Sequence, residues 1–469
     1  MTNILIRIEQ VITSLDKRSQ DNWLVGYDTK KLNFLTRELF QQLTQLSRYG
    51  QPPTIFLAQS NPLKFVAGFL AAVAAKCPLF ICNPSWIATE WQQVLDVVQP
   101  DLVWGEGLDF LVKKPLKNEA KPFYSGKIMI PTGGSSGKIR FAIHTWETLS
   151  ASARGFQSHF ALKEVNSCCV LPLYHVSGLM QLLRSFLTGG RLFVLPYKAL
   201  KAGARGNIDP KDFFISLVPT QLQYLLTSHR ASWLSQFQTV LLGGAPPWPE
   251  LLTEARLKHI PLALTYGMTE TASQIVTLKP KEFLVGNNSC GRVLPHAQVK
   301  IHNLVGQECQ AGETGAIHIE AKSLCLGYYP QPFKETDIFC PEDLGYVDEE
   351  GYLHIVGRCS KKIITGGENV YPNEVEAAIY STKLVEDVCV IGLADNYWGQ
   401  AVTAVYVPHK SETAINDLRA AIASKLSNFK QPKYWLPIGA LPRNAQGKVN
   451  YEQVKKLAEK CLMNQKVVA

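Results

Sequence analysis

The stretch TVLLGGAPPWPELLTEARLKHIPLALTYGMTE, residues 239–270, contains one copy of the unit that builds the fold. An apolar, β-branched run ends at Leu242, and two glycines then turn the chain. A helix can start at Pro246 and Pro247, because proline suits the first helical turn, and the helical pattern continues to about Lys258. A second strand then ends near Thr265. The stretch predicts a strand–helix–strand unit.

The same alternation of strand and helix patterns continues along most of the chain. Apolar β-branched runs alternate with longer helical patterns, which is typical of βαβ units around parallel sheets. We therefore expect an α/β fold whose large N-terminal domain has parallel or mixed sheets flanked by helices. Open α/β sheets bind ligands beyond the carboxyl ends of their strands, and both glycine-bearing turns of residues 239–270 fall there.

The chain changes character close to Arg358. LGYVDEEGYLHIVGR (344–358) predicts a hairpin with Glu-Gly at its turn, and the following residues predict a strand, a Gly-Gly loop and a helix after Pro372. We place a domain boundary here. Residues 1–357 are expected to form the N-terminal domain, and residues 358–469 a smaller α+β C-terminal domain.

Composition indicates a globular protein with a modest basic excess. Of the 469 residues, 46% are hydrophobic and 19% are charged, and the formal net charge is +9. Because no long Lys/Arg run is present, this favours an enzyme acting on anionic small molecules over a nucleic-acid binder. The 11 cysteines are scattered, without a CxxC pair or zinc-ligand spacing, so we expect reduced thiols in the cytoplasm.

The sequence carries no pattern typical of secretion or of a membrane span. The N-terminal residues carry charges throughout and lack the apolar core of a signal peptide. The most apolar stretch, residues 65–82, is interrupted by Lys76 and Pro78, which favours a buried helix followed by a strand. We therefore expect a cytoplasmic protein with no integral membrane association.

A glycine-rich segment, PTGGSSGKIRFAIHTW (131–146), places glycines and serines ahead of Lys138 and Arg140. Backbone N–H groups, hydroxyls and a lysine can together cradle phosphate, but an ordinary glycine-rich turn explains the same residues. Taken alone, the segment leaves both interpretations open. The candidate phosphate-binding residues are Thr132, Gly133, Gly134, Ser135, Ser136, Gly137 and Lys138.

Five motifs follow one another along the chain: the glycine-rich segment, LTYGMTETASQ (264–274), EDLGYVDEEGYLHIVGR (342–358), TGGENVYPNEVE (365–376) and RNAQGK (443–448). Their order and spacing resemble those of the adenylate-forming superfamily, which includes acyl-CoA synthetases, nonribosomal adenylation domains and beetle luciferases. The resemblance implies that a substrate carboxylate attacks the α-phosphate of ATP to give an acyl-adenylate and pyrophosphate, and that a thiol then displaces AMP. It implies Mg²⁺ as the metal and coenzyme A as the thiol.

The resemblance also implies which residues bind the nucleotide. The glycine-rich segment would hold the β- and γ-phosphates, although it reads Lys138-Ile139-Arg140-Phe141 where the family usually has Lys-Pro-Lys-Gly. Before the expected ribose-binding aspartate, Pro341-Glu342 replaces the family's Thr-Gly. The implied residues are Gly243, Gly244 and Ala245 beside adenine, Tyr266 stacked on it with Gly267 and Met268 after it, and Asp343 at the ribose.

By the same resemblance, four catalytic residues act on the reacting groups. Lys448 would bridge the substrate carboxylate and the α-phosphate, and Glu270 would bind Mg²⁺. Thr269 would bond the α-phosphate, and Arg358 would assist at the ribose or phosphate. Two of these residues have an open alternative role: Glu270 as a helix N-terminal carboxylate and Lys448 as a surface lysine. The alternative for the ribose-binding Asp343 is a solvated turn residue.

The C-terminal domain is expected to move during the reaction. Lys448 lies on this small domain, yet the thiol must later reach the same carbonyl carbon. The family solves this problem by rotating the domain between half-reactions, and the matching hinge position is Ser360. After rotation, Gly366, Gly367 and Glu368 would line the thiol tunnel.

Within the superfamily, the chain resembles the o-succinylbenzoate–CoA ligases of menaquinone and phylloquinone synthesis. LPLYHVSGL (171–179), TETASQIVTL (269–278) and CLGYYPQP (325–332) carry this resemblance. The implied substrate has two carboxylates and a ketone, which suit a polar pocket. A packing role is the alternative for His175, Thr271 and Gln274. The candidate substrate residues are His175, Ser177, Gly178, Arg184, Thr271 and Gln274.

Other functions remain open from the sequence. They are another aryl- or acyl-CoA ligase, a stand-alone adenylation enzyme that loads a carrier protein, and a catalytically silent adenylate-binding protein. The retained Glu270, Arg358 and Lys448 argue against the last of these. We expect small-molecule partners without nucleic acid, and an oligomeric state anywhere from monomer to tetramer.

Overall fold

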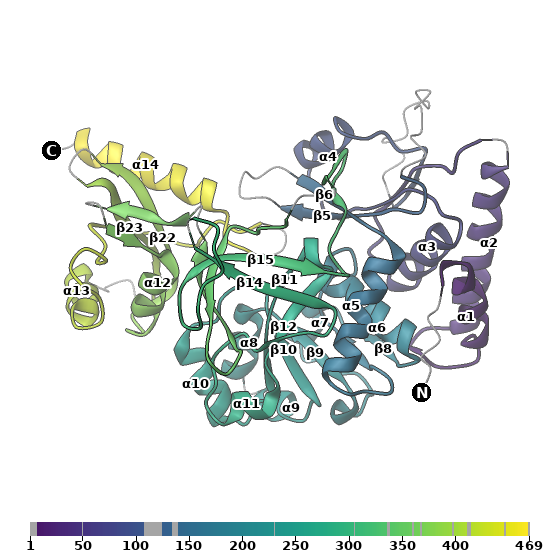
Figure 1. The fold of residues 1–469 in the computed structure, drawn as a ribbon, viewed down its shortest axis with the longest axis horizontal. Helices are drawn as coiled ribbons and strands as arrows, with labels where there is room; N and C mark the ends of the chain where they lie inside the picture. The colour runs from purple at the N-terminus through teal and green to yellow at the C-terminus, as the bar shows by residue number, and fades with distance from the viewer. Residues whose placement is uncertain are drawn as a thin grey trace.

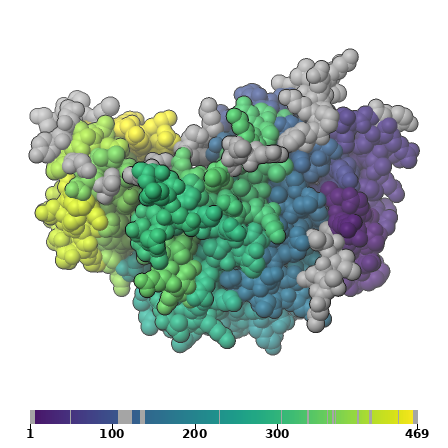
Figure 2. Space-filling model, viewed as in Figure 1, coloured from purple at the N-terminus to yellow at the C-terminus, as the bar shows by residue number. Residues whose placement is uncertain are grey.

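The computed structural model shows two bodies, a large one before Arg358 and a smaller one formed by the residues after it (Figure 1). Figure 2 shows the C-terminal residues, in yellow and light green, packed against the darker green segments that precede them. The structure describes residues 7–48, 50–106, 124–133, 139–228, 230–303, 305–334, 338–358, 361–365, 368–395, 398–409, 414–444 and 447–467.

A central sheet organises the large body. Its first six strands are parallel, and the last two strand pairs, β11 with β12 and β12 with β13, are antiparallel. In spatial order they are β1 (Leu24–Val25), β8 (Leu192–Val194), β7 (Ser167–Cys169), β9 (Phe214–Leu217), β10 (Thr239–Leu242), β11 (Leu262–Met268), β12 (Ser273–Thr277) and β13 (Arg292–Val293).

A second large sheet, the N-terminal sheet, is also mixed. Its parallel part carries the earliest strands, and an antiparallel part follows the glycine-rich segment. In spatial order the strands are β17 (Gln331–Pro332), β16 (Gly327–Tyr328), β6 (Ile139–His144), β5 (Ile128–Gly133), β3 (Leu79–Ile81), β2 (Ile55–Leu57) and β4 (Leu102–Trp104).

Two smaller sheets complete the chain. The linking sheet is antiparallel and contains β14 (Ala297–His302), β15 (Gly315–Ala321), β18 (Asp343–Val347) and β19 (Leu353–Arg358). The C-terminal sheet contains β21 (Glu368–Val370), β20 (Ile363–Thr365), β23 (Gly399–Pro408), β22 (Val385–Asp395) and β24 (Tyr434–Pro437). Within the described ranges the C-terminal strands pair only with one another, which supports the proposed boundary near Arg358.

The helices cover these sheets. Three helices lie between the central sheet and the N-terminal sheet. One apolar core joins α3, α5 and α6 to strands of the central and N-terminal sheets. The α-helices are α1 (Val11–Lys17), α2 (Thr29–Ser47), α3 (Pro62–Ala74), α4 (Ala88–Leu95), α5 (Trp146–His159), α6 (Val176–Thr188), α7 (Tyr197–Lys201), α8 (Pro219–Thr227), α9 (Ala231–Leu234), α10 (Pro249–Leu257), α11 (Pro280–Leu284), α12 (Pro372–Tyr380), α13 (Ile415–Ala423) and α14 (Tyr451–Val467).

The strand–helix–strand unit of residues 239–270 is present, with two corrections. The helix begins at Pro249 instead of Pro246, because Trp248 is extended, as residues before proline usually are. The second strand does not end near Thr265 but continues to Met268, because β12 folds back and pairs with its end. Residues 266–268 therefore belong to β11, whereas the sequence predicted that the strand ends before them.

Two other local predictions, for residues 65–82 and for residues 344–358, are confirmed. Residues 65–82 form most of α3, followed by β3. β18 and β19 form the hairpin before Arg358, with Gly351 at a φ of 82° in its turn. The cysteines of the described ranges are free thiols, and most are buried. No described helix combines the length and the apolar character that crossing a membrane requires.

Candidate active site

The site begins where the central sheet changes from parallel to antiparallel. A short 3-10 helix, η5 (Thr269–Thr271), joins β11 to β12. The next two residues, Ala272 and Ser273, have φ values of 52° and 85°. Left-handed backbone is uncommon for residues other than glycine, and it persists where the surrounding structure enforces it. The strained turn therefore holds Glu270 at the carboxyl end of β11.

Asp343 is hydrogen-bonded to two other residues that the sequence assigned to the nucleotide. It starts β18 and is only 5% exposed. Its Oδ2 accepts a hydrogen bond from the Tyr266 hydroxyl at 2.7 Å, and its Oδ1 accepts one from Arg358 Nε at 2.7 Å. Burial, and then the charge of Asp343, raise the pKa of Tyr266, so the phenol remains a donor. The solvated-turn alternative for Asp343 is therefore wrong.

Glu270 is a buried carboxylate that is hydrogen-bonded to a neutral side chain. It is 7% exposed, and its Oε1 accepts a hydrogen bond from the Tyr328 hydroxyl at 2.7 Å. Its backbone carbonyl accepts one from the Cys325 N–H at 2.7 Å. The Arg140 guanidinium lies over the Tyr328 ring, 4.2 Å from its centroid. The buried carboxylate therefore offers an oxygen of the kind that hard cations prefer as a ligand.

Tyr328 and His144 support this region, and sequence reasoning gave neither a role. His144 Nε2–H donates to the Thr269 carbonyl at 2.8 Å, and its Nδ1 lies 3.0 Å from the Thr148 hydroxyl. Burial lowers the pKa of His144 to about 4, so the ring is neutral. Because a carbonyl can only accept, the proton must sit on Nε2, and the Thr148 hydroxyl donates to Nδ1. Only the tertiary contacts reveal these roles.

Lys448 comes to the same site from the C-terminal domain. Its N–H donates to Asn444 Oδ1 at 2.9 Å, which closes a tight loop. Solvent reaches the side chain, yet the protein around it lowers its pKa, an effect that Arg358 strengthens and that Glu270 and Asp343 oppose. Such charge interactions weaken quickly with distance. Lys448 therefore lies within the field of the charged groups on β18, β19 and η5.

His175 lies at the start of α6, the helix that carries several of the predicted acid-binding residues. It is the residue just before the helix, and its Nε2 is buried without a partner among the described residues. Burial, and then the charge of Lys448, lower the pKa of His175 to about 4, so the ring is neutral. Ser177 and Gly178 follow in the first turn, where a Cβ on Gly178 would lie 2.1 Å from the Pro172 carbonyl oxygen. The glycine allows the loop before α6 to pack against the helix.

Arg184 is a buried cation near the far end of α6. It is 2% exposed, and its Nη2 donates to Gln274 Oε1 at 2.6 Å and to Ser273 Oγ at 3.2 Å. Its guanidinium lies over the Phe156 ring, 4.3 Å from the centroid. Burial lowers its pKa to about 9. Its Nε and Gln274 Nε2 are buried without partners among the described residues. The hydrogen bonds that this buried cation donates therefore go to neutral groups.

The remaining described candidates are placed as follows. Gly243 and Gly244 follow β10, with Gly244 at a φ of 84°, and Ala245 continues the same exposed turn. The Thr271 hydroxyl donates to the Ser273 carbonyl at 2.7 Å, within its own turn, which favours the packing alternative for this residue. Glu368 lies on β21 of the C-terminal sheet.

Part of the predicted site lies outside the described residues. β5 and β6, which flank the glycine-rich segment, pair antiparallel, with Thr132 opposite Arg140 and Gly133 opposite Ile139. Thr132 and Gly133 therefore lie at the carboxyl end of β5, an interior strand of the N-terminal sheet. The predicted residues outside the described ranges are Gly134, Ser135, Ser136, Gly137, Lys138, Ser360, Gly366 and Gly367.

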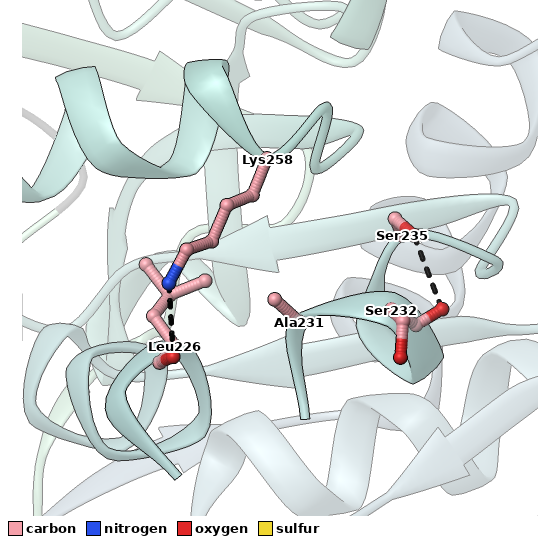
Figure 3. Close-up of a pocket in the computed structure, with 5 residues that line it drawn as sticks. All are labelled: Leu226, Ala231, Ser232, Ser235 and Lys258. Atoms are coloured by element: carbon pink, nitrogen blue, oxygen red, sulfur yellow. Dashed lines mark hydrogen bonds between the residues drawn. The ribbon is translucent and has the colours of Figure 1, made fainter. Parts of the chain in front are cut away.

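A separate hollow of about 440 Å³ lies elsewhere on the large body (Figure 3). It is lined by residues of α8, α9 and the end of α10, elements that lead into the amino ends of β10 and β11. Its cation, Lys258, already donates to the Leu226 carbonyl at 3.0 Å and to Glu254 Oε1 at 2.6 Å. The candidate site lies at the opposite, carboxyl ends of these strands, so the hollow is not part of it.

Comparisons with known proteins agree with this geometry. The model of the AMP-binding enzyme family matches residues 125–329, and that of the AMP-binding enzyme C-terminal domain matches residues 374–448. A protein from Listeria innocua serovar 6a named 2-succinylbenzoate–CoA ligase is 34% identical over 466 residues, which cover 96% of this chain and 89% of that protein.

Solved structures show the same likeness. The o-succinylbenzoate CoA synthetase from Bacillus subtilis, in complex with the acyl-adenylate intermediate OSB-AMP, superposes with a TM-score of 0.78 at 26% identity, covering 94% of this chain and 97% of that chain. The same enzyme in complex with ATP and a magnesium ion gives a TM-score of 0.79 at 26% identity, covering 94% of this chain and 99% of that chain. The chain belongs to the AMP-binding family of adenylate-forming enzymes.

Proposed function

We propose that this protein is an acid–thiol ligase that joins 2-succinylbenzoate to coenzyme A through an acyl-adenylate. The observation that carries the proposal is the position of Lys448. This lysine of the C-terminal domain shares the electrostatic environment of Glu270, Asp343 and Arg358 in the large body. A cation placed among nucleotide-binding groups is what the union of a carboxylate with a phosphate requires, since both reactants are anions.

In the first half-reaction, a substrate carboxylate oxygen bonds to the α-phosphorus of ATP, and the bond to the pyrophosphate oxygen breaks. The Lys448 ammonium neutralises charge shared by the carboxylate and the α-phosphate. Asp343, held by Tyr266 and Arg358, accepts hydrogen bonds from the ribose hydroxyls. These residues act mainly by positioning and by electrostatic stabilisation, because the step needs no general base.

The residues around Glu270 suit a magnesium ion. A buried carboxylate that accepts a hydrogen bond from a neutral phenol is a hard oxygen ligand of the kind that Mg²⁺ prefers. When bound, Mg²⁺ would offset charge on the phosphate oxygens. Tyr328 orients the carboxylate, and the Thr269 carbonyl is fixed by His144.

In the second half-reaction, the sulfur of coenzyme A bonds to the acyl carbon while the carbon–oxygen bond to AMP breaks, and the thiol proton is released. The proposed cycle rotates the C-terminal domain about Ser360 before this step, so that Gly366, Gly367 and Glu368 meet the thiol. A free thiol acceptor and a cytoplasmic location complete the proposal, with a place in the synthesis of a naphthoquinone.

Two facts support 2-succinylbenzoate over other acids. Relatives with this name are about one-third identical to the chain. In addition, Arg184 and Gln274 carry buried polar atoms without partners among the described residues. An uncompensated buried cation is costly unless an anion joins it, and a substrate with a second carboxylate provides one. His175 and Ser177, on the same helix, are proposed to contact the rest of the acid.

The deciding experiment measures pyrophosphate release from ATP and Mg²⁺ with 2-succinylbenzoate, benzoate, a medium-chain fatty acid and several amino acids, with and without coenzyme A. We expect release with 2-succinylbenzoate, and a thioester only when coenzyme A is present. Release with another acid alone would retain the family and reject this substrate. Transfer to a carrier protein but not to coenzyme A would favour a carrier-loading enzyme.

A further inference from the structure

An aromatic contact joins the large body to the C-terminal domain beside the adenine side of the site. Trp248 lies a few residues after Gly244, caps the start of α10 and packs against the core of the central sheet. Its indole stacks on the ring of Tyr380, with centroids 4.9 Å apart and ring planes at 16°. Tyr380 is the last residue of α12, a helix that also contacts β19. The stack therefore fixes one domain against the other.

From Tyr380, a chain of polar contacts leads to the loop of the proposed catalytic lysine. The Tyr380 hydroxyl donates to Asp387 Oδ1 at 2.6 Å, and the Asp387 carboxylate forms an ion pair with Arg443. Arg443 Nη1 in turn donates to the Gly447 carbonyl oxygen at 2.7 Å. Gly447 directly precedes Lys448, so every link from the interdomain stack to the lysine is a direct contact.

The contacts from Tyr380 to Gly447 are partly shielded from solvent, so they can hold the backbone before Lys448 in place. The side chains of Arg443 and Asp387 are 30% and 19% exposed, and bonds between charged groups in such surroundings are stronger than those on an open surface. Burial, and then the charge of Asp387, raise the pKa of Tyr380, so its hydroxyl keeps the proton that it donates. Gly447 has a φ of 76°, a left-handed conformation that lets the loop turn just before Lys448. Arg443 stabilises this turn through its hydrogen bond to the Gly447 carbonyl oxygen.

We infer that Trp248 and Tyr380 are positioning residues for the adenylation half-reaction. The stack aligns the C-terminal domain with the adenine side of the site, and the Asp387–Arg443 pair transmits that alignment to the backbone just before Lys448. The inference rests on the proposed function, because it requires Lys448 to act in adenylation. Once the domain has rotated, as the proposed cycle requires, the thioester step no longer uses the stack.

The test uses the full chain with Trp248→Ala and Tyr380→Phe, assayed separately in each half-reaction. ATP–pyrophosphate exchange with 2-succinylbenzoate reports adenylation, and coenzyme A thioester formation from supplied acyl-adenylate reports the second step. We expect each variant to slow adenylation by about tenfold, since a small misplacement of a catalytic group has effects of this order. The second step should keep its rate, and Trp248→Phe should restore most of the exchange.

Tyr434→Phe is the matched control. The Tyr434 hydroxyl donates to Asp395 Oδ2 at 3.0 Å in the same domain, and neither residue belongs to the contacts traced above from Tyr380 to Gly447. Its loss should leave both half-reactions unchanged, and retained thioester synthesis shows that each variant is folded. Equal losses in both half-reactions would show a purely structural role and overturn the inference. Unchanged adenylation in both variants would also overturn it, while Lys448→Ala, assayed in parallel, reports separately on the proposed function.

Discussion

Two buried charges with neutral partners distinguish this site at the scale of single residues. The Glu270 carboxylate accepts from a phenol, and the Arg184 guanidinium donates to an amide and a hydroxyl. A buried charge is normally paired, so each of these arrangements indicates a ligand of opposite sign. The charges have different proposed ligands, a cation at Glu270 and a second substrate carboxylate at Arg184.

Lys448→Ala tests the first half-reaction. Removing the ammonium leaves two anions to meet without a shared cation, so we expect adenylation to fall by about 10²-fold or more. Thioester formation from supplied acyl-adenylate should survive. Lys430→Ala is the control, because Lys430 is a lysine of the same domain paired with Glu374 away from this loop. A comparable loss in both half-reactions would contradict the assigned role.

Arg184→Met tests the acid pocket. The substitution keeps an unbranched side chain of similar length and removes the charge, so the KM for 2-succinylbenzoate should rise about 10²-fold. The KM for any monocarboxylic acid accepted by the enzyme should change little. Stability should hold or increase, because an unbalanced buried charge is gone.

Arg191→Met provides the comparison for that experiment. Arg191 also lies over a phenylalanine ring, that of Phe213 at 5.0 Å, but it is half-exposed and paired with Asp212. The KM values of this control should stay at those of the unmodified protein. An unchanged KM in Arg184→Met, together with lower stability, would assign Arg184 to packing.

At the scale of elements, the pairing of β11 with β12 determines where the catalytic residues lie. The register shifts between Tyr266 and Gly267, and the turn that follows contains left-handed residues. Tyr266 remains on β11, where it bonds Asp343, whereas Glu270 is carried beyond the strand toward Tyr328. One hairpin thus supplies groups to both the ribose side and the metal side of the proposed site.

Gly267→Ala tests the closeness of this hairpin. A Cβ at this position would lie 2.2 Å from the Ser273 carbonyl oxygen, so backbone must move. We expect the free energy of unfolding to fall by about 1–3 kcal/mol, with a loss of adenylation, as measured by urea denaturation and pyrophosphate exchange. Gly439→Ala, where a Cβ would meet no atom within 4 Å, should change stability by less than about 0.5 kcal/mol. Similar effects of both substitutions would contradict the packing argument.

At the scale of the whole molecule, buried neutral histidines make stability depend on pH. Burial lowers the pKa of His144 and of His296 to about 4 in the folded state, below the value near 6.5 of an unfolded histidine. Between these values the unfolded chain binds more protons, so stability falls as the pH falls. From about pH 7 to pH 5, each of the two should lower the free energy of unfolding by about 1–2 kcal/mol.

Urea denaturation at the two pH values measures this loss. His144→Gln, which has no proton to gain in this range but retains a donor for the Thr269 carbonyl, should show a smaller decrease on acidification than the unmodified protein. An equal decrease in both proteins would show that His144 does not contribute to the pH dependence.

Much of this molecule is predictable from local patterns. The alternation of apolar runs and helical patterns predicted the α/β fold, and the motifs predicted Tyr266, Asp343 and Arg358, which the structure brings into contact. The limits of α10 and β11 were less accurate. A proline cluster does not specify which proline starts the helix, and the end of a strand depends on the strand that pairs with it.

The sequence by itself determined the fold class, the order of the motifs and the types of chemical group present, because periodicity and turn residues act over a few positions of chain. Only the tertiary structure decided which groups meet. The Tyr328–Glu270 bond, the His144–Thr269 bond and the Trp248–Tyr380 stack join residues 58, 125 and 132 positions apart. No local pattern encodes such pairs, since they arise from the packing of sheets and domains that brings distant segments together.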